Sequence, residues 1–333
     1  MKKVFLKLVL LSLPILILIG LFFVLDPFRI VYTYGDYSGN MYISLNREYV
    51  SSKMYFKNIK KYNYNSFILG SSRTLAFHSK SWRKFLSPDA SPFVFDASGE
   101  TLSGIYEKVS YIDKTAADFN NCLLIICTDH TFGVEADQNS HIFIKHPTIA
   151  GTSWFNFYVV FIKDYLNFLF LKNYFQFLFT HKYGPSMKGY IDYRIIRYDT
   201  VANDQYIIDR ENEIKQDSTN YYEKRKDIFY TRDSIISPAI PQISESHVQM
   251  LKEIKSIFVK HHTNYKIIIG PLYNQVPLNS ADLLILQNIF GKDNVFNFSG
   301  KNKFTVNTGN YYEDSHYRPS VGDSIMSIIY KKQ

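Results

Sequence analysis

Cysteine is nearly absent from the 333-residue sequence, which contains only Cys122 and Cys127. Two cysteines five positions apart in one apolar run exclude a disulfide framework and a cysteine zinc cluster, and they indicate two buried thiols. Internal repeats and low-complexity segments are lacking too. A content of 46% hydrophobic and 17% aromatic residues excludes a disordered, collagen-like or coiled-coil chain. The chain is long enough for one large domain, or two small ones, with a hydrophobic core.

A strong basic surface is also lacking. The net charge is +8, but three of the positive charges belong to Lys2, Lys3 and Lys7, ahead of any acidic residue. The remaining excess is too weak to indicate a nucleic-acid partner. Residues 192–233 mix basic and acidic side chains with tyrosines, which predicts a solvated insertion or lid.

A long hydrophobic run is present at the N-terminus. Residues Leu8 to Leu25 are 18 consecutive uncharged residues, which follow the three lysines and end before Asp26-Pro27. About 20 apolar residues span the core of a bilayer, so we expect residues 1–26 to be a transmembrane anchor. The lysines predict a cytoplasmic N-terminus and place residues 27–333 outside the cytoplasm, as in a bacterial cell envelope. A cleaved signal peptide is the alternative, but the run is longer than usual and no small-x-small cleavage site follows it.

Residues 27–64 are rich in tyrosine and are interpreted as a juxtamembrane connector. Short apolar runs then alternate with helical patterns from residue 65 to 333, which predicts an α/β domain with a parallel sheet and helices on both faces. The strands are expected at 65–70, 93–96, 122–127, 266–270 and 295–298, and the helices at 74–86, 102–117, 244–262, 281–290 and 319–330.

Residues 150–240 interrupt this alternation and are interpreted as a helical and loop insertion. Its segment 154–179 is densely aromatic, but Lys163, Asp164 and Lys172 break it before it reaches a spanning length. The segment is either a pair of buried helices or a surface that rests on the membrane or on an integral partner.

Two short segments carry candidate catalytic residues. Ser72 lies in the sequence Gly-Ser-Ser-Arg, just after the first expected strand, where a nucleophile or an anion site commonly lies in an α/β fold. The same pattern is also ordinary turn chemistry. Near the C-terminus, Glu313 and Asp314 precede His316 in a single loop, so that one loop can supply a base and the carboxylate that orients it.

These segments resemble the SGNH, or GDSL-like, hydrolase superfamily. Its blocks are a Gly-Asp-Ser motif, a Gly after the second strand, an Asn after the third and a final Asp-x-x-His. The sequences FILGSSRT and DSHYRP are similar to the membrane-anchored extracytoplasmic branch that includes teichoic-acid D-alanyl transfer and alginate-acetylation proteins. The resemblance covers about residues 62–130 and 244–333 and implies a flavodoxin-like fold.

The resemblance implies a role for each matching residue. Ser72 matches the nucleophile, His316 the general base and Glu313, by spacing, the orienting carboxylate, with Asp314 as the alternative if the loop is shifted. Gly99 matches the residue whose N–H stabilises the oxyanion together with the N–H of Ser72.

The sequence departs from the family after the third strand, where the Asn is missing. Thr128 or His130 is the replacement donor that the sequence offers, whereas an ionised Asp129 would repel an oxyanion. Arg73 is a candidate contact for an anionic substrate group, or else forms a surface salt bridge. The spacing of the other histidines predicts no metal site, and the chemistry requires no cofactor.

We therefore expect an extracytoplasmic serine esterase or O-acyltransferase that acts on acyl esters of a cell-surface polysaccharide or polymer. A multi-spanning acyltransferase is the partner that the resemblance implies. The alternative is a non-catalytic scaffold or polymer-binding protein with the same fold, which the missing Asn and the Glu in place of Asp favour. A tethered solute-binding protein fits less well, because it would need two lobes. A close contact between Ser72 and His316 distinguishes the enzyme from both alternatives.

Overall fold

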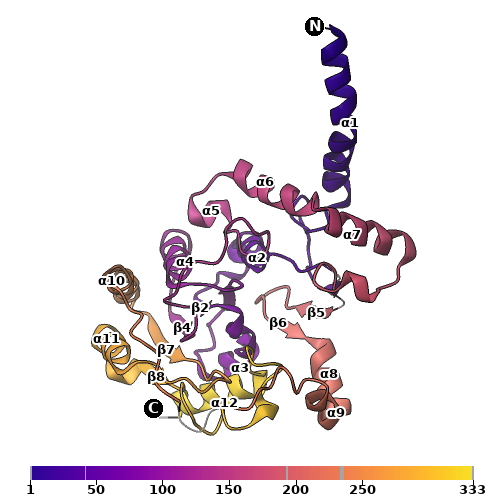
Figure 1. The fold of residues 1–333 in the computed structure, drawn as a ribbon. Helices are drawn as coiled ribbons and strands as arrows, with labels where there is room; N and C mark the ends of the chain where they lie inside the picture. The colour runs from indigo at the N-terminus through magenta and orange to yellow at the C-terminus, as the bar shows by residue number, and fades with distance from the viewer. Residues whose placement is uncertain (1, 42, 193, 233–235, 332–333) are drawn as a thin grey trace.

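A five-stranded parallel sheet forms the centre of an α/β fold (Figure 1). The computed structural model describes residues 2–41, 43–192, 194–232 and 236–331, and the side chains of residues 2–6, 8–10, 40 and 41 lie outside this description. The strands follow the order β3-β2-β4-β7-β8. They are β2 (Ser66–Gly70), β3 (Pro92–Asp96), β4 (Asn121–Ile126), β7 (Asn264–Ile269) and β8 (Val295–Asn297).

The apolar runs form strands because both of their faces are buried. In β2, Phe67 and Leu69 belong to the hydrophobic core on one side of the sheet, whereas Ile68 belongs to the core on the other side. This alternation is the geometry of a strand covered on both faces. The helices of the first side are α2 (Arg47–Tyr62), α4 (Leu102–Thr115), α10 (Glu245–Lys260) and α11 (Ser280–Phe290); those of the second are α3 (Ser79–Trp82) and α12 (Pro319–Tyr330).

The predicted helix at 74–86 is wrong in detail. The chain there forms the 3-10 helix η1 (Ser72–Ala76), the single turn α3 and the 3-10 helix η2 (Arg83–Phe85). The spacing of apolar residues was suited to one helix, but Phe77 and His78 leave the helical region between the first two turns, with ψ angles of 88° and 135°. Short turns let this segment follow the end of the sheet.

The interpretation of residues 27–64 as a connector also requires correction. Residues 47–62 form α2, which covers the sheet with Val50, Met54 and Tyr55. Its first turn and its buried face also carry polar residues, among them Arg47 and Glu48, so the apolar pattern of the helix is weak. These polar side chains find buried partners elsewhere in the fold, as described below.

The insertion contains strands as well as helices. A second, antiparallel sheet has the order β1-β5-β6. The elements outside the parallel sheet are β1 (Gly39–Met41), α5 (Pro147–Ala150), α6 (Trp154–Tyr165), α7 (Phe168–Thr180), β5 (Arg194–Tyr198), β6 (Gln205–Ile207), α8 (Ile208–Gln216) and α9 (Ser218–Glu223).

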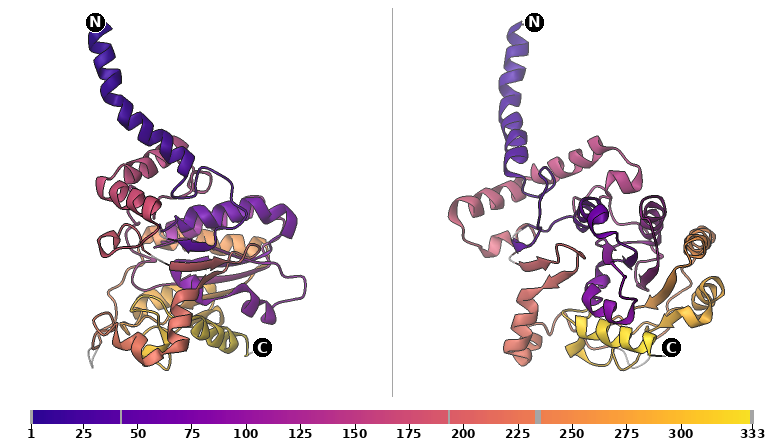
Figure 2. Two further views of the ribbon diagram at one scale, coloured as in Figure 1. Left: turned by 90° about the vertical axis from the view of Figure 1, so that its right-hand side faces the viewer. Right: turned by 180° about the vertical axis from the view of Figure 1, so that it is seen from behind.

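The N-terminal helix α1 (Lys2–Leu25) extends from the body at the end opposite to α12, and α6 and α7 lie between α1 and the parallel sheet (Figures 1 and 2). Among the described residues, no helix has both the length and the apolar content to cross a membrane. The predicted anchor includes side chains at positions 1–6 and 8–10, which lie outside the described residues.

The end of α1 belongs to the folded body. Phe22 is fully buried and its ring lies 5.4 Å from that of Tyr165 in α6. Asp26 is buried too and accepts hydrogen bonds from the backbone N–H of Ile30 (2.8 Å) and Val31 (3.1 Å). The folded body therefore already begins near Phe22, shortly before the predicted boundary at residue 26.

Candidate active site

Ser72 follows β2 directly and begins η1. The preceding Gly70 has a φ of +151°, and a Cβ atom there would lie 2.8 Å from the carbonyl oxygen of Ile125 in β4. Glycine is needed at this position, because the chain leaves the sheet against a neighbouring strand. The sharp exit places Ser72 at the carboxyl edge of the parallel strands.

The structure brings His316 to Ser72 from the other end of the chain. The Nε2 atom of His316 lies 2.7 Å from Oγ of Ser72, and its Nδ1 atom contacts Oε1 of Glu313. In the tautomer that satisfies both contacts, Nδ1–H donates to the carboxylate and Nε2 accepts from the serine hydroxyl. This is the arrangement of a nucleophile, its base and an orienting acid. Asp314 does not share it, and its carboxylate accepts from the Ser315 hydroxyl at 3.4 Å.

The loop that carries His316 is fixed by helices of the insertion. The hydroxyl of Tyr221 in α9 donates to the carbonyl of Tyr312 (2.7 Å). Glu211 in α8 accepts two hydrogen bonds from the Arg318 guanidinium, at 2.8 and 3.0 Å. The position of the histidine therefore depends on the insertion as well as on the loop sequence.

Buried polar contacts hold η1 from below. The hydroxyl of Thr74 donates to Asp96 at the end of β3 (2.8 Å), and Arg47 of α2 forms a 2.8 Å ion pair with the same carboxylate. The guanidinium of Arg47 also donates to Asn203 of the insertion, to its side chain at 2.9 Å and its carbonyl at 2.8 Å. This network joins α2, the sheet, the insertion and the serine turn.

The imidazole of His316 is neutral at physiological pH. Burial, together with the positive charges of Arg73, Arg210 and Arg194, lowers its pKa to about 3. A neutral imidazole can accept the serine proton, whereas an imidazolium cannot. The same charges favour the serine alkoxide or an oxyanion nearby.

Ser72, His316 and Glu313 open into a cavity of about 490 Å³. Gly99 lines this cavity too, with a φ of +61° that a side chain would strain. The structure thus brings the serine, the histidine and the predicted oxyanion glycine to one place. The remaining lining includes Arg47, Ser98, Phe143, Arg194, Tyr198, Arg210 and Ser315.

Besides Asp314, three predicted site residues do not line the described part of this cavity. Thr128 is buried. Arg73 and His130 both contact Asp129 instead, at 2.7 and 2.6 Å. The Asp129 carboxylate holds both side chains, and for Arg73 this is the salt bridge that the sequence left open as the alternative to a substrate contact. Although burial raises the pKa of Asp129, the hydrogen bond from His130 and the charge of Arg73 hold it below its usual value.

Sequence reasoning missed Arg194 and Arg210. They belong to β5 and α8, in a segment whose mixed charges are typical of a solvated surface. Arg210 forms an ion pair with Glu313, and Arg194 forms no ion pair with any described residue. One sequence signal could have found Arg194. Residues two apart in a strand share a face, and Arg194, Ile196 and Tyr198 of β5 all line the cavity.

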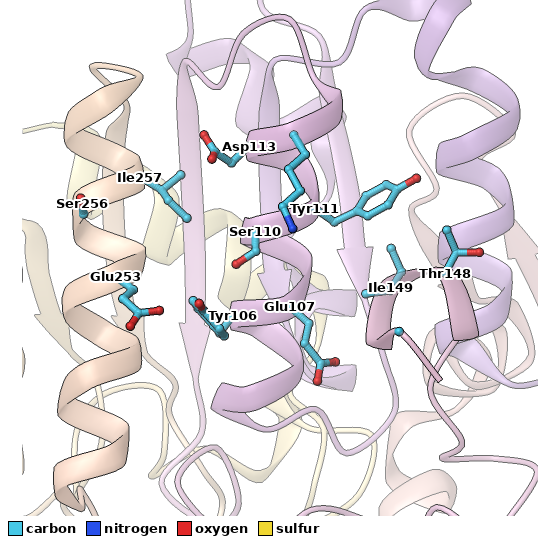
Figure 3. A pocket seen from close by; sticks show the side chains of 12 residues that line it. Tyr106, Glu107, Ser110, Tyr111, Asp113, Thr148, Ile149, Glu253, Ser256 and Ile257 are labelled. Atoms are coloured by element: carbon cyan, nitrogen blue, oxygen red, sulfur yellow. The ribbon is translucent and has the colours of Figure 1, made fainter. Parts of the chain in front are cut away.

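Other polar clusters lack this chemistry. A groove of about 650 Å³ lies between α4, α5 and α10, where Tyr106 and Glu253 face each other (Figure 3), but none of its described lining residues is a histidine. Cys127, Asp129 and His130 offer three donor atoms within 4.8 Å of one another. Burial raises the pKa of the Cys127 thiol to about 11, which disfavours the thiolate that a metal would need.

The two histidines just before the insertion do not form a pair. His141 contacts Asp164 of α6 at 2.7 Å, and His146 caps α5 by accepting from the N–H of Thr148. Each ring has a structural partner of its own, so neither is positioned as one half of a two-histidine metal site.

Comparison of the chain with protein-family models, curated proteins and solved structures finds no significant match.

Proposed function

We propose that the chain is a serine esterase or O-acyltransferase that acts outside the cytoplasm on acyl esters of a cell-surface polysaccharide or polymer. The 2.7 Å contact between Ser72 and His316 is the observation that carries this proposal. Two residues 244 positions apart meet with hydrogen-bond geometry beside a glycine that can donate an N–H. A structural histidine would not need that combination.

The proposed reaction uses residues of this chain alone. Nε2 of His316 takes the proton of Ser72 as Oγ attacks the ester carbonyl carbon, and the N–H groups of Ser72 and Gly99 stabilise the oxyanion. The tetrahedral intermediate collapses, the C–O bond to the alcohol breaks, and His316 returns the proton to the leaving alcohol. Water or a sugar hydroxyl then attacks the acyl-serine in the same way. Glu313 keeps the imidazole in the productive tautomer throughout.

The strand order supports an SGNH-type, flavodoxin-like fold. Numbered by chain order, the five parallel strands follow 2-1-3-4-5, the order of flavodoxin-like sheets. Ser72 follows the first of these strands and Gly99 the second, as in the superfamily that the motifs resemble. The missing Asn after β4 remains a departure from that superfamily.

The membrane anchor is part of the proposal. The apolar run from Leu8 to Leu25 lies in α1, which extends away from the body (Figure 1). Three lysines precede the run and would stay on the cytoplasmic side. The catalytic domain would then be tethered on the outer side, beside a membrane-embedded acyltransferase that supplies or receives acyl groups.

The test is labelling of the full chain in detergent with a fluorophosphonate probe, followed by mass mapping of the adduct. We use the full chain because Phe22 and Asp26 are buried in the body. We expect an adduct on Ser72 that is lost in Ser72→Ala and in His316→Ala. Ser315→Ala is the matched control, because Ser315 lines the same cavity without a histidine contact. A folded protein that takes no label on Ser72 would contradict the proposal.

One observation favours a non-catalytic scaffold as the second candidate. The residues directly after β4, Cys127 to His130, include no Asn, and Thr128 does not line the described cavity, so a third oxyanion donor is missing there. Loss of one such donor can cost about 100- to 1,000-fold in rate. The scaffold function predicts polysaccharide binding that Ser72→Ala leaves unchanged, in the absence of labelling.

A further inference from the structure

The helices α6 and α7 expose large apolar side chains on their outer side. Phe155, Phe168 and Phe179 are 80%, 75% and 78% exposed, and Val159 and Leu169 are more than two-fifths exposed. We call these five residues the α6–α7 apolar face. Large exposed apolar side chains along two consecutive helices indicate an interaction surface.

The same helices are already packed on their inner side. Phe157, Phe161, Phe170 and Tyr174 are buried in one hydrophobic core with Phe22 of α1. The helices are therefore neither wholly buried nor amphipathic in the usual sense. A helix that is apolar on the side away from the core needs a second apolar partner.

The spacing of the exposed residues makes two stripes. Phe155, Val159 and Lys163 are four residues apart in α6, and in α7 the residues Phe168 and Lys172 are four apart, with Phe179 seven further on. Such spacings put side chains on one helix face. Each stripe thus combines apolar side chains with an exposed lysine, whose stem can lie along an apolar layer while its ammonium group reaches polar groups.

The segment that contains α6 and α7 carries a net positive charge. Residues 154–183 contain three lysines, at 163, 172 and 182, and Asp164 as their single acid. Asp164 contacts His141 at 2.7 Å and Lys163 at 3.7 Å, and Lys163 also donates to the carbonyl of Asn139, so Lys172 and Lys182 are the lysines left for an outside partner. The outer side therefore suits a partner that is negatively charged at its surface and apolar beneath.

The position of α1 identifies that partner. Phe22 and Phe23 of α1 lie beside Tyr165 and Tyr158 of α6, with ring centroids 5.4 and 6.2 Å apart. They are two or three residues from the end of α1, so α6 contacts α1 about 3–4.5 Å along the helix axis from that end. Interfacial helices bury their apolar side about 5–10 Å into the headgroup layer. If α1 enters a bilayer, α6 and α7 adjoin its surface.

We propose that the α6–α7 apolar face lies in the headgroup layer of a membrane rich in anionic lipid, with Lys172 and Lys182 near the lipid phosphates. This inference rests on the proposed anchor and is independent of the proposed esterase chemistry. It assigns the aromatic segment of the insertion a membrane contact that fixes the orientation of the catalytic body.

The test measures depth in the membrane at single positions of the full chain. Phe155→Cys, Phe168→Cys and Phe179→Cys are labelled with an environment-sensitive nitrobenzoxadiazole dye and reconstituted into vesicles of phosphatidylcholine and phosphatidylglycerol. Cys122 and Cys127 are fully buried and will not compete for the label. Leu284→Cys on α11 is the remote control, because Leu284 is also an exposed apolar residue, and Leu13→Cys reports on the anchor itself.

We expect lipids with a spin label near the headgroup to quench the dye at positions 155, 168 and 179, and to leave position 284 unquenched. We also expect the quenching to weaken when phosphatidylcholine replaces phosphatidylglycerol and in Lys172→Glu/Lys182→Glu. Quenching that is equal in both lipids would overturn the assignment to anionic lipid. A blue shift without lipid quenching would overturn it in favour of a protein partner or a second copy.

The anchor and the face are separated by the probe at position 13. Quenching at 13 without quenching at 155, 168 and 179 overturns this inference and leaves the anchor standing. Absence of quenching at all four positions overturns both. Labelling of Ser72 by the fluorophosphonate probe is measured on the same vesicles, so a failure of the esterase proposal is seen independently.

Discussion

Arg210 of the insertion and Glu313 of the C-terminal loop form an ion pair within the candidate triad. The pair uses Oε2 of the glutamate, while Oε1 contacts Nδ1 of His316. Each carboxylate oxygen therefore has its own cationic or N–H donor, and the glutamate is held in one orientation. A longer acid than aspartate needs such a clamp, because its additional torsion would otherwise let the carboxylate turn away from the imidazole.

Removal of the Arg210–Glu313 ion pair should lower the reactivity of Ser72 more than the stability of the fold. We expect Arg210→Gln to lower the rate of fluorophosphonate labelling by up to about 100-fold, as small displacements of catalytic groups do. Lys215→Gln is the matched control. Lys215 is an exposed cation of α8 and does not line the described part of the cavity. Equal labelling rates for the two variants would contradict the role assigned to Arg210.

Substitution of the two carboxylates of the loop, Glu313 and Asp314, should have very different effects on labelling of Ser72. Glu313→Gln keeps the size of the side chain but removes the charge that stabilises the imidazolium, so we expect a loss of about 1,000- to 10,000-fold in labelling rate or in turnover. Asp314→Asn should have little effect, because Asp314 contacts the Ser315 hydroxyl and not the imidazole. The reverse ranking would indicate that the loop is shifted and that Asp314 is the orienting acid.

The parallel sheet was predictable because its strands are buried on both faces. Runs such as Phe67-Ile68-Leu69 cannot alternate polar and apolar residues, and they stand out from the sequence. The helix α2 was not predictable in the same way. Its Arg47 and Glu48 are buried only because Asp96, Asn203 and Lys108 neutralise or bond them, and these partners lie far away in the sequence.

In the candidate site, too, the residues with a local sequence motif were predictable and those with distant partners were not. Ser72 and His316 were found from local motifs, each of which has a meaning within a few residues. Arg194 and Arg210 were missed because they act across a distance of more than 100 residues, on Glu313 and His316. Within the sequence they are two charged residues in a charged segment. For Arg73 the sequence left two partners open, and only the fold shows the salt bridge with Asp129.

The low pKa of His316 predicts an unusual pH profile. An ordinary histidine with a pKa of about 6.5 is only about 3% neutral at pH 5, and labelling would fall accordingly. Because burial and three arginines lower the pKa of His316 to about 3, its base form persists, and we expect nearly constant labelling between pH 5 and 7. Arg194→Gln removes one of these positive charges. We expect it to raise the pKa of His316, so that labelling begins to fall at a higher pH than in the unmodified protein.

The control for this profile is Arg197→Gln. Arg197 lies on the opposite face of β5 from Arg194 and does not line the described part of the cavity. Its substitution should not change the pH at which labelling falls on acidification. If labelling of the unmodified protein instead fell near pH 6.5, the stabilisation of the imidazolium by Glu313 would outweigh the opposing effects of burial and the arginines.

Gly322 gives a last test of how the serine turn is supported. A Cβ atom on Gly322 would lie 1.8 Å from the carbonyl oxygen of Ala76, the last residue of η1. Alanine is the better helix former by about 1 kcal/mol, so α12 alone would favour Gly322→Ala. Alanine has no rotamer to move, however, and the atom that it meets is backbone. The two segments must separate, and overpacking of this kind costs about 1–3 kcal/mol.

We therefore expect Gly322→Ala to lower the urea midpoint of unfolding and to slow the labelling of Ser72, although it changes no residue of the triad. Ser324→Ala is the control on the same helix, since Ser324 is exposed and its hydroxyl donates only to the carbonyl of Ser320. It should leave both quantities nearly unchanged. A lower urea midpoint with unaltered labelling would mean that η1 keeps Ser72 at His316 without α12, through Thr74 and Asp96 alone.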